Sequence, residues 1–222
     1  MTLSARAIVC DAYGTMLDVH GPARRLADRL GPHAEAISAA WRQKQLEYTW
    51  VHSLADRYSD FAELTEAALR VALRAHGVDE AIVPDLIAEN LKLDAHPEVA
   101  GALAALRDRG VGRAVLSNGT PASLARQLGT AGIAELFEAV LSADAVRVFK
   151  PDARVYRLAT ERFACPAGEL AFLSSNPWDA FGAREFGFQV VWVNREAKPD
   201  EYGLRGTVTE IADLSALPAL LA

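Results

Sequence analysis

The sequence predicts an α/β protein whose doubly wound parallel sheet carries a helical cap inserted after the first strand. A short apolar run at residues 7–10 indicates a buried strand. Residues 20–93 show helix signals without a convincing strand, whereas strand and helix patterns alternate after them. Such alternation is typical of a parallel sheet with helices on both faces. We therefore expect a core domain over residues 1–18 and 95–222 and a cap domain over residues 19–94.

Composition narrows the classes of function. Of the 222 residues 51% are hydrophobic, and the net charge of −6 comes without a basic block. This argues against nucleic acid or an anionic membrane as the main partner. No apolar run reaches the length of a transmembrane helix, and the N-terminus lacks the apolar stretch of a secretion signal. Cys10 and Cys165 lack the spacing of metal ligands, so we expect reduced thiols in a cytoplasmic protein.

The cap is predicted to be entirely helical. Its helices are expected over residues 22–30, 33–51, 61–76 and 79–91. Pro22 suits the first turn of a helix, and Gly31-Pro32 ends that helix. Asp60 is a candidate N-cap, because Glu63 follows three residues later in the pattern of a capping box. A glycine at position 77 ends this third helix.

The core is predicted from the strand and helix patterns that follow the cap. Strands are expected at residues 113–117, 139–142, 170–174 and 189–194, and helices at 98–109, from 121, at 151–163 and up to 186. The strand at 7–10 must join the sheet that these strands form. We therefore expect the cap to cover the carboxyl ends of the strands, where Asp11 lies.

Polar residues gather where the predicted strands end. Asp11 directly follows the first strand and leads into a turn at Gly14. Each such residue is also compatible with an ordinary turn or helix cap. Ligands in open α/β sheets bind just outside the carboxyl ends of the strands, so together these residues predict a functional site. The set is Asp11, Tyr13, Thr15, Ser117, Asn118, Lys150, Ser174, Ser175, Asn176 and Asp179.

Four motifs in this set resemble those of the haloacid dehalogenase superfamily. They are Asp11-Ala-Tyr-Gly-Thr15, Ser117-Asn-Gly119, Lys150-Pro-Asp152 and Ser174-Ser-Asn-Pro-Trp-Asp179. They are most similar to the L-2-haloacid dehalogenase branch, and the segment from Ala40 to Tyr48 resembles the arginine segment of that branch's cap. The likeness covers nearly the whole chain and implies a Rossmann-like core with a cap.

Two positions favour this branch over phosphoryl-transferring relatives on chemical grounds. Those relatives have an acid at the position of Tyr13 to protonate the leaving group, and tyrosine is a poor acid near neutral pH. Relatives that bind Mg²⁺ also have an acid at the position of Ser175, and Mg²⁺ prefers several anionic oxygens. A leaving halide needs no proton. We therefore expect neither a metal nor another cofactor.

The resemblance implies a covalent reaction. Asp11 would attack the α-carbon of a small 2-halocarboxylate, expel halide and form an ester. Water would then attack the carboxyl carbon of Asp11, so that an L-2-haloalkanoic acid gives a D-2-hydroxy acid with inversion. Homodimers are common in this branch, so a homodimer is expected as well.

The resemblance also implies a role for each site residue. Donors such as Thr15 would hold the Asp11 carboxylate, and Lys150 would keep it ionised. Asp179 would activate water with help from Asn176 and Ser174, and Tyr156 would support the site by hydrogen bonding. The substrate carboxylate would contact Ser117 and Lys150. The halide would contact Arg42, Asn118 and Trp178, and the apolar wall would comprise Tyr13, Gln43, Leu46, Phe61 and Trp178.

Simpler interpretations remain open at this point. Arg42 is also compatible with a solvated helix face, and Leu46 and Phe61 with ordinary packing. At the level of the whole protein, the alternatives are a Mg²⁺-dependent phosphatase of the same fold and a non-catalytic binding module.

Overall fold

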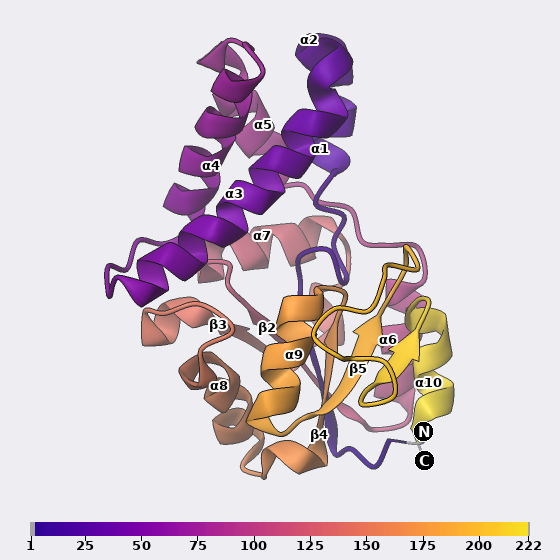
Figure 1. Cartoon of the computed structure of the whole chain (residues 1–222). Helices are drawn as coiled ribbons and strands as arrows, with labels where there is room; N and C mark the ends of the chain where they lie inside the picture. Colours follow the sequence, from indigo (N-terminus) through magenta and orange to yellow (C-terminus); the bar gives the residue numbers. More distant parts are fainter. Residues whose placement is uncertain (1–2, 222) are drawn as a thin grey trace.

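A six-stranded parallel sheet forms the centre of the protein (Figure 1). The structure is a computed structural model that describes residues 3–221. The strands lie in the order β3-β2-β1-β4-β5-β6. Their bounds are β1 Ala7–Cys10, β2 Gly112–Ser117, β3 Ala139–Ser142, β4 Leu170–Ser174, β5 Gln189–Val193 and β6 Thr209–Ile211. This order confirms the predicted α/β class with a doubly wound parallel sheet.

The central position of β1 brings the predicted site together. Every residue of β1 is buried, and Cys10 pairs in register with Val115 on one side and Leu173 on the other. The ends of the three middle strands therefore coincide at one edge of the sheet. Asp11, Ser117 and Ser174 lie at that edge because they terminate or directly follow these strands.

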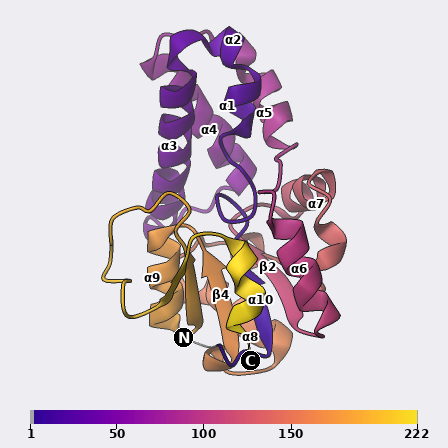
Figure 2. The same ribbon diagram turned by 90° about the vertical axis from the view of Figure 1, so that its right-hand side faces the viewer.

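Helices cover both faces of the sheet. Figure 2 shows α9 on one side and α6 on the other. The helices of this part of the chain are α6 Val99–Asp108, α7 Pro121–Thr130, α8 Ala153–Phe163, α9 Pro177–Phe186 and α10 Leu217–Leu220. The main apolar core lies between them and the sheet, and it includes the fully buried Phe172 and Trp192.

The segment between β1 and β2 is helical and stands over the carboxyl end of the sheet (Figure 1). Its helices are α1 Gly21–Arg25, α2 Ala27–Leu30, α3 Ala34–Leu54, α4 Phe61–Ala75 and α5 Val83–Asn90. They bury a second apolar cluster that includes Ile37, Leu69 and Leu86. This separate cluster is consistent with a cap, and the exact domain bounds stay a prediction. None of the helices in residues 3–221 is long and apolar enough to cross a membrane.

Several element boundaries differ from the sequence prediction. The first cap helix is interrupted at Leu26, which leaves two short helices instead of one over 22–30. The helix predicted from residue 151 begins at Ala153, because the Asp152 carboxylate caps it by accepting from the Arg154 N–H. Strand β6 and helix α10 were not predicted, since three or four residues carry too little periodicity. Asp60 does cap α4, through the N–H groups of Ala62 and Glu63.

Candidate active site

The turn after β1 places a buried carboxylate at the mouth of the sheet. Asp11 is only 5% exposed. Gly14 has φ of +83°, a conformation that favours glycine, and its N–H donates to the Leu17 carbonyl at 2.8 Å. The turn folds Thr15 back so that its hydroxyl donates to Asp11 Oδ2 at 2.8 Å. The sequence of the turn thus fixes the direction of the carboxylate.

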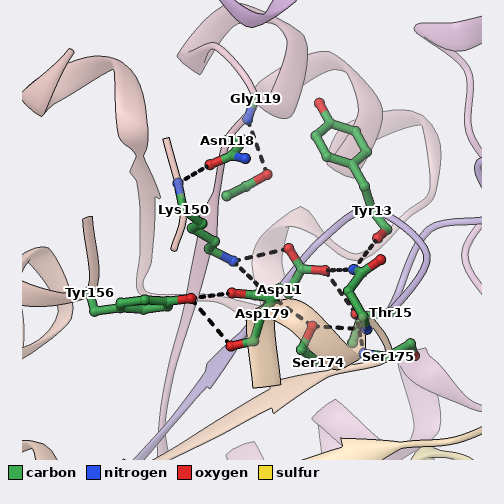
Figure 3. A network of polar contacts seen from close by, with 12 residues as sticks. Asp11, Tyr13, Thr15, Asn118, Gly119, Lys150, Tyr156, Ser174, Ser175 and Asp179 are labelled. Carbon is green, nitrogen blue, oxygen red and sulfur yellow. Dashed lines mark hydrogen bonds and ion pairs between the residues drawn. The ribbon is translucent and has the colours of Figure 1, made fainter. Parts of the chain in front are cut away.

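The Asp11 carboxylate accepts hydrogen bonds on both oxygens (Figure 3). Oδ2 accepts from Thr15 and from Asn176 Nδ2 at 2.9 Å, whereas Oδ1 accepts from Lys150 Nζ at 3.0 Å. Donors of this kind stabilise the anionic form and hold the group in one orientation. Asp11 is therefore set up as an oriented anion next to a cavity.

Lys150 bridges two carboxylates inside the protein. Its Nζ lies 3.0 Å from Asp11 Oδ1 and 3.0 Å from Asp179 Oδ2, and its side chain is fully buried. Burial alone would lower the pKa of Lys150, but the charges of Asp11 and Asp179 outweigh it and the pKa is raised above its usual value. Burial raises the pKa of Asp179 despite the ammonium beside it. The cluster holds one cation between two acids.

Asp179 is held by a second set of donors (Figure 3). The Tyr156 hydroxyl donates to Oδ1 at 2.7 Å, and the Ser174 hydroxyl donates to Oδ2 at 3.0 Å. Tyr156 reaches this position because Gly182 on α9 has no side chain, since a Cβ there would lie 2.6 Å from the Tyr156 hydroxyl. Tyr156 was predicted as hydrogen-bond support, and the contact agrees with that role.

Ser117 and Asn118 shape the neighbouring strand end. The Ser117 hydroxyl accepts from the Gly119 N–H at 3.2 Å, and Asn118 Oδ1 accepts from the Lys150 N–H at 2.9 Å. Asn118 therefore positions the main chain that carries the lysine, and it also borders the cavity over Asp11. Ser117 is buried and does not border that cavity, so its contact with a substrate carboxylate stays a prediction.

Arg42 reaches the site from α3 above the sheet. Its Nη1 donates to Gln45 Oε1 at 2.8 Å, and its Nη2 lies 3.4 Å from both the Tyr13 carbonyl and Asn176 Oδ1. Burial lowers the pKa of Arg42 from its usual value, although arginine stays charged in proteins. The guanidinium is partly buried against the Asp11 turn, which argues against a fully solvated position on the helix face.

A narrow cavity lies over Asp11. Its free space of about 10 Å³ has room for about one water molecule. It is lined by Asp11, Tyr13, Arg42, Leu46, Phe61, Asn118 and Trp178. The Trp178 Nε1 is buried and has no hydrogen-bond partner among residues 3–221. The site thus combines an oriented carboxylate, a guanidinium and an apolar wall.

The haloacid dehalogenase-like hydrolase family matches this chain over residues 5–187. The chain belongs to this family. It is 41% identical to (S)-2-haloacid dehalogenase 4A of Burkholderia cepacia, across 100% of this chain and 97% of that protein. It is also 41% identical to (S)-2-haloacid dehalogenase 1 of Pseudomonas sp. strain CBS-3, across 97% of this chain and 96% of the relative.

Solved structures of dehalogenases superpose closely on this member of the family. A dehalogenase in an intermediate complex gives a TM-score of 0.97 at 40% identity, over 100% of this chain and 99% of the other. The L-2-haloacid dehalogenase from Xanthobacter autotrophicus with covalently bound chloropropionic acid gives a TM-score of 0.89 at 34% identity. That comparison covers 97% of this chain and 98% of the other.

The site residues of this family member do not fit a magnesium ion, which some proteins of this fold bind. The Lys150 ammonium lies between Asp11 and Asp179, where it would repel a divalent cation. Ser175, whose N–H donates to the Thr15 hydroxyl beside Asp11, offers only a hydroxyl, which is a weaker ligand for Mg²⁺ than a carboxylate. Residues 3–221 contain no group of three or more His, Cys, Asp or Glu side chains that could hold a metal.

The structure favours a different glutamine from the one singled out in the sequence. Gln43 is exposed on α3 and does not border the cavity over Asp11, so its place in the substrate wall stays a prediction without support from this geometry. Gln45 is buried, accepts from Arg42 and donates to Thr65 Oγ1 at 2.6 Å. Its position three residues after Arg42 on the same helix face was a signal that the sequence did contain.

Tyr13 contributes its ring and not its acidity. Figure 3 shows the ring directed away from the Asp11 carboxylate. The hydroxyl donates to Gln127 Oε1 at 2.8 Å, and burial raises the pKa of Tyr13 well above its usual value. The hydroxyl is therefore engaged away from Asp11, and its raised pKa makes it a poor acid at neutral pH. Gln127 was not predicted, because it lies on α7, more than a hundred residues along the chain.

Proposed function

We propose that this protein hydrolyses small L-2-haloalkanoic acids to D-2-hydroxy acids and halide, as an (S)-2-haloacid dehalogenase. The observation that carries the proposal is the Asp11 carboxylate, which is held by Thr15, Asn176 and Lys150 on the floor of a cavity that Arg42 covers. Relatives with this name are about 41% identical over nearly their whole length, which supports the same activity here.

The first step is a displacement at carbon. An Asp11 oxygen attacks C2 of the substrate, the new C–O bond forms, and the carbon–halogen bond breaks with its electron pair on the halide. The halide would lie near Arg42, Asn118 and the Trp178 N–H. The guanidinium and the unpartnered indole N–H are suited to a departing anion, since their charge and dipole oppose the developing negative charge.

The second step hydrolyses the ester. Water attacks the Asp11 carboxyl carbon, and Asp179 takes its proton. Thr15 and Asn176 donate to the oxygen that becomes negative in the tetrahedral intermediate. The bond between the carboxyl carbon and the ester oxygen then breaks, the leaving alkoxide takes up the proton that Asp179 accepted from water, and the Asp11 carboxyl group loses its new proton to solvent. The hydroxy acid departs with an oxygen of Asp11, and C2 has been inverted once.

The remaining site residues would bind the substrate. Lys150 and Ser117 would contact its carboxylate, and Ser174 and Tyr156 would hold Asp179 in place. The wall against the alkyl group would comprise Tyr13, Gln43, Leu46, Phe61 and Trp178, of which all except Gln43 border the cavity.

We also propose a cytoplasmic homodimer with a core over residues 1–18 and 95–222 and a cap over 19–94. Both cysteines are free thiols, which is compatible with a reducing compartment. Val51 and Leu54 at the end of α3 are 54% and 88% exposed, which supports contact with a second copy.

Incubation with L- and D-2-chloropropionate in the presence of EDTA tests the activity. We expect chloride from the L-form only, at a rate that the chelator does not change, because no step needs a metal. Chloride measured with and without EDTA provides the readout, and p-nitrophenyl phosphate is the control substrate. Phosphate release that EDTA abolishes would replace this proposal by the phosphatase alternative.

A further inference from the structure

Gln127 connects the substrate wall to the end of the helical segment. It is fully buried on α7, which lies between the helical segment and the sheet in Figure 1. Its Oε1 accepts from the Tyr13 hydroxyl at 2.8 Å, and its Nε2 donates to the Asn90 carbonyl at 2.8 Å. One amide thus joins two places that lie more than seventy residues apart in the sequence.

The Tyr13 ring is tightly confined at the position that Gln127 holds. It stacks on Phe61 with ring centroids 5.3 Å apart and an angle of 22° between the planes. Its far edge lies against the backbone of Gly119, where an added Cβ would be 2.4 Å from the hydroxyl oxygen. Ring face, ring edge and hydroxyl are all engaged, so the ring cannot tilt without breaking its bond to Gln127.

The second partner of Gln127 lies at a connection between the helices and the sheet. Asn90 is the last residue of α5, and the chain returns from it to a bridge between Ala95 and Leu17 in the Asp11 turn. Carbonyls in the last turn of a helix lack partners within the helix, so the Gln127 amide caps one of them. Movement of the helical segment at this connection would therefore be transmitted to Gln127.

We propose that Gln127 is a positioning residue that locks the Tyr13 ring to the end of α5 and thereby limits the length of acid that the site accepts. This inference rests on the proposed dehalogenase function. The cavity over Asp11 has room for about one water molecule, so any substrate must displace part of its wall. While Gln127 holds the Tyr13 ring, the ring is displaced least when a substrate binds. Short acids such as chloropropionate are therefore favoured over longer ones.

Three variants test the lock: Gln127→Leu, Tyr13→Phe and the double variant. The readout is the ratio of kcat/KM for L-2-chloropropionate to that for L-2-chlorobutyrate, with kcat and KM determined separately. We expect Gln127→Leu to lower this ratio roughly tenfold, mainly through KM, because one methylene gives discrimination of that order in a fitted apolar pocket. Tyr13→Phe should lower it similarly, and the double variant should add nothing further.

Gln189→Leu is the matched control. Gln189 also joins separate segments through its side-chain amide, by donating to the Ser4 and Gly168 carbonyls, but at the far end of the sheet. Its substitution should lower thermal stability and leave the substrate ratio unchanged. The proposal would be overturned if the substrate ratio in Gln127→Leu stayed at the wild-type value. It would also be overturned if the effects of the two single changes multiplied in the double variant. If Gln127→Leu does not fold, Tyr13→Phe probes the same bond from its other end.

Amide hydrogen exchange tests the lock without any substrate. In the variants at 127 and 13, amides of residues 12–17 and 91–96 should exchange roughly tenfold faster than in the wild type, since the lock restrains both segments. The control variant should not show this change. Exchange that stays at the wild-type rate refutes the lock. Absence of chloride from the wild type refutes the proposed function, so the two failures are distinguishable.

Discussion

Asp11→Asn is expected to lower chloride release by roughly 10⁴-fold or more, the scale on which loss of a catalytic nucleophile acts. An amide oxygen is a far weaker nucleophile than a carboxylate. The substitution also places an NH₂ group toward Thr15 or Lys150, both of which donate to Asp11 in the wild type. The measurement is initial chloride release from L-2-chloropropionate, at equal concentrations of folded protein.

Asp213→Asn is a suitable control for the Asp11 substitution. Asp213 caps the short helical turn after the edge strand β6 by accepting from the Ser215 N–H, and it does not border the cavity over Asp11. Its substitution should leave kcat unchanged. Activity of Asp11→Asn within tenfold of this control would show that another group attacks the substrate.

Lys150→Met is expected to have the second largest effect, on both activity and stability. The methionine is of similar length but leaves Asp11 and Asp179 buried without their cation. Removing one partner of a buried ion pair costs roughly 3–5 kcal/mol of unfolding free energy. Chloride release should fall by roughly 10³-fold, since a preorganised charge at the reacting group is lost. Urea unfolding and chloride release measure the two effects.

The stability loss in Lys150→Met should depend on pH. In the wild type, the pKa of Lys150 is raised in the folded state. Its contribution to folding stability is therefore complete below the usual lysine pKa of 10.5 and is lost only as the pH rises through the higher folded pKa. In the variant, burial and the nearby Asp11 carboxylate keep the pKa of Asp179 above its unfolded value, now without the opposing charge of Lys150. A raised acid pKa destabilises the protein above that pH, so the variant should regain stability as pH falls toward 5.

Lys92→Met is the control for a lost surface charge. Lys92 pairs with Glu89 and its side chain is 48% exposed, so the change should cost less than about 1 kcal/mol at any pH. A stability loss in Lys150→Met as small as this, with no dependence on pH, would mean that Lys150 does not balance the two acids.

The sheet and the polar residues around Asp11 could be predicted from the sequence, because the carboxyl ends of parallel strands lie at the same edge of a sheet. Asp11, Ser117 and Ser174 each follow an apolar run, and the register of β1, β2 and β4 makes these ends coincide. The same local signals located the Asp60 cap, whose carboxylate accepts from its own helix. In these cases a few neighbouring residues determine the feature, so the sequence pattern was sufficient.

Features that depend on packing between segments far apart in the chain could not be predicted from the sequence. The bond between Tyr13 and Gln127 joins residues whose closeness follows from how α7 packs near the turn after β1, and no spacing reveals it. Gln45 faces Arg42 because residues three apart share a helix face, a local signal that was available in the sequence, whereas its bond to Thr65 depends on the packing of α3 against α4. Short elements such as β6 depend on pairing with β5 and carry no periodicity of their own.

The central claim is that the Asp11 carboxylate bonds covalently to carbon. A single turnover in H₂¹⁸O with enzyme in excess over L-2-chloropropionate tests it most directly, by mass spectrometry of the lactate formed. If Asp11 attacks carbon, the first product carries unlabelled oxygen from Asp11 and the label enters the aspartate. Lactate that carries ¹⁸O in its hydroxyl group after this first turnover would contradict it.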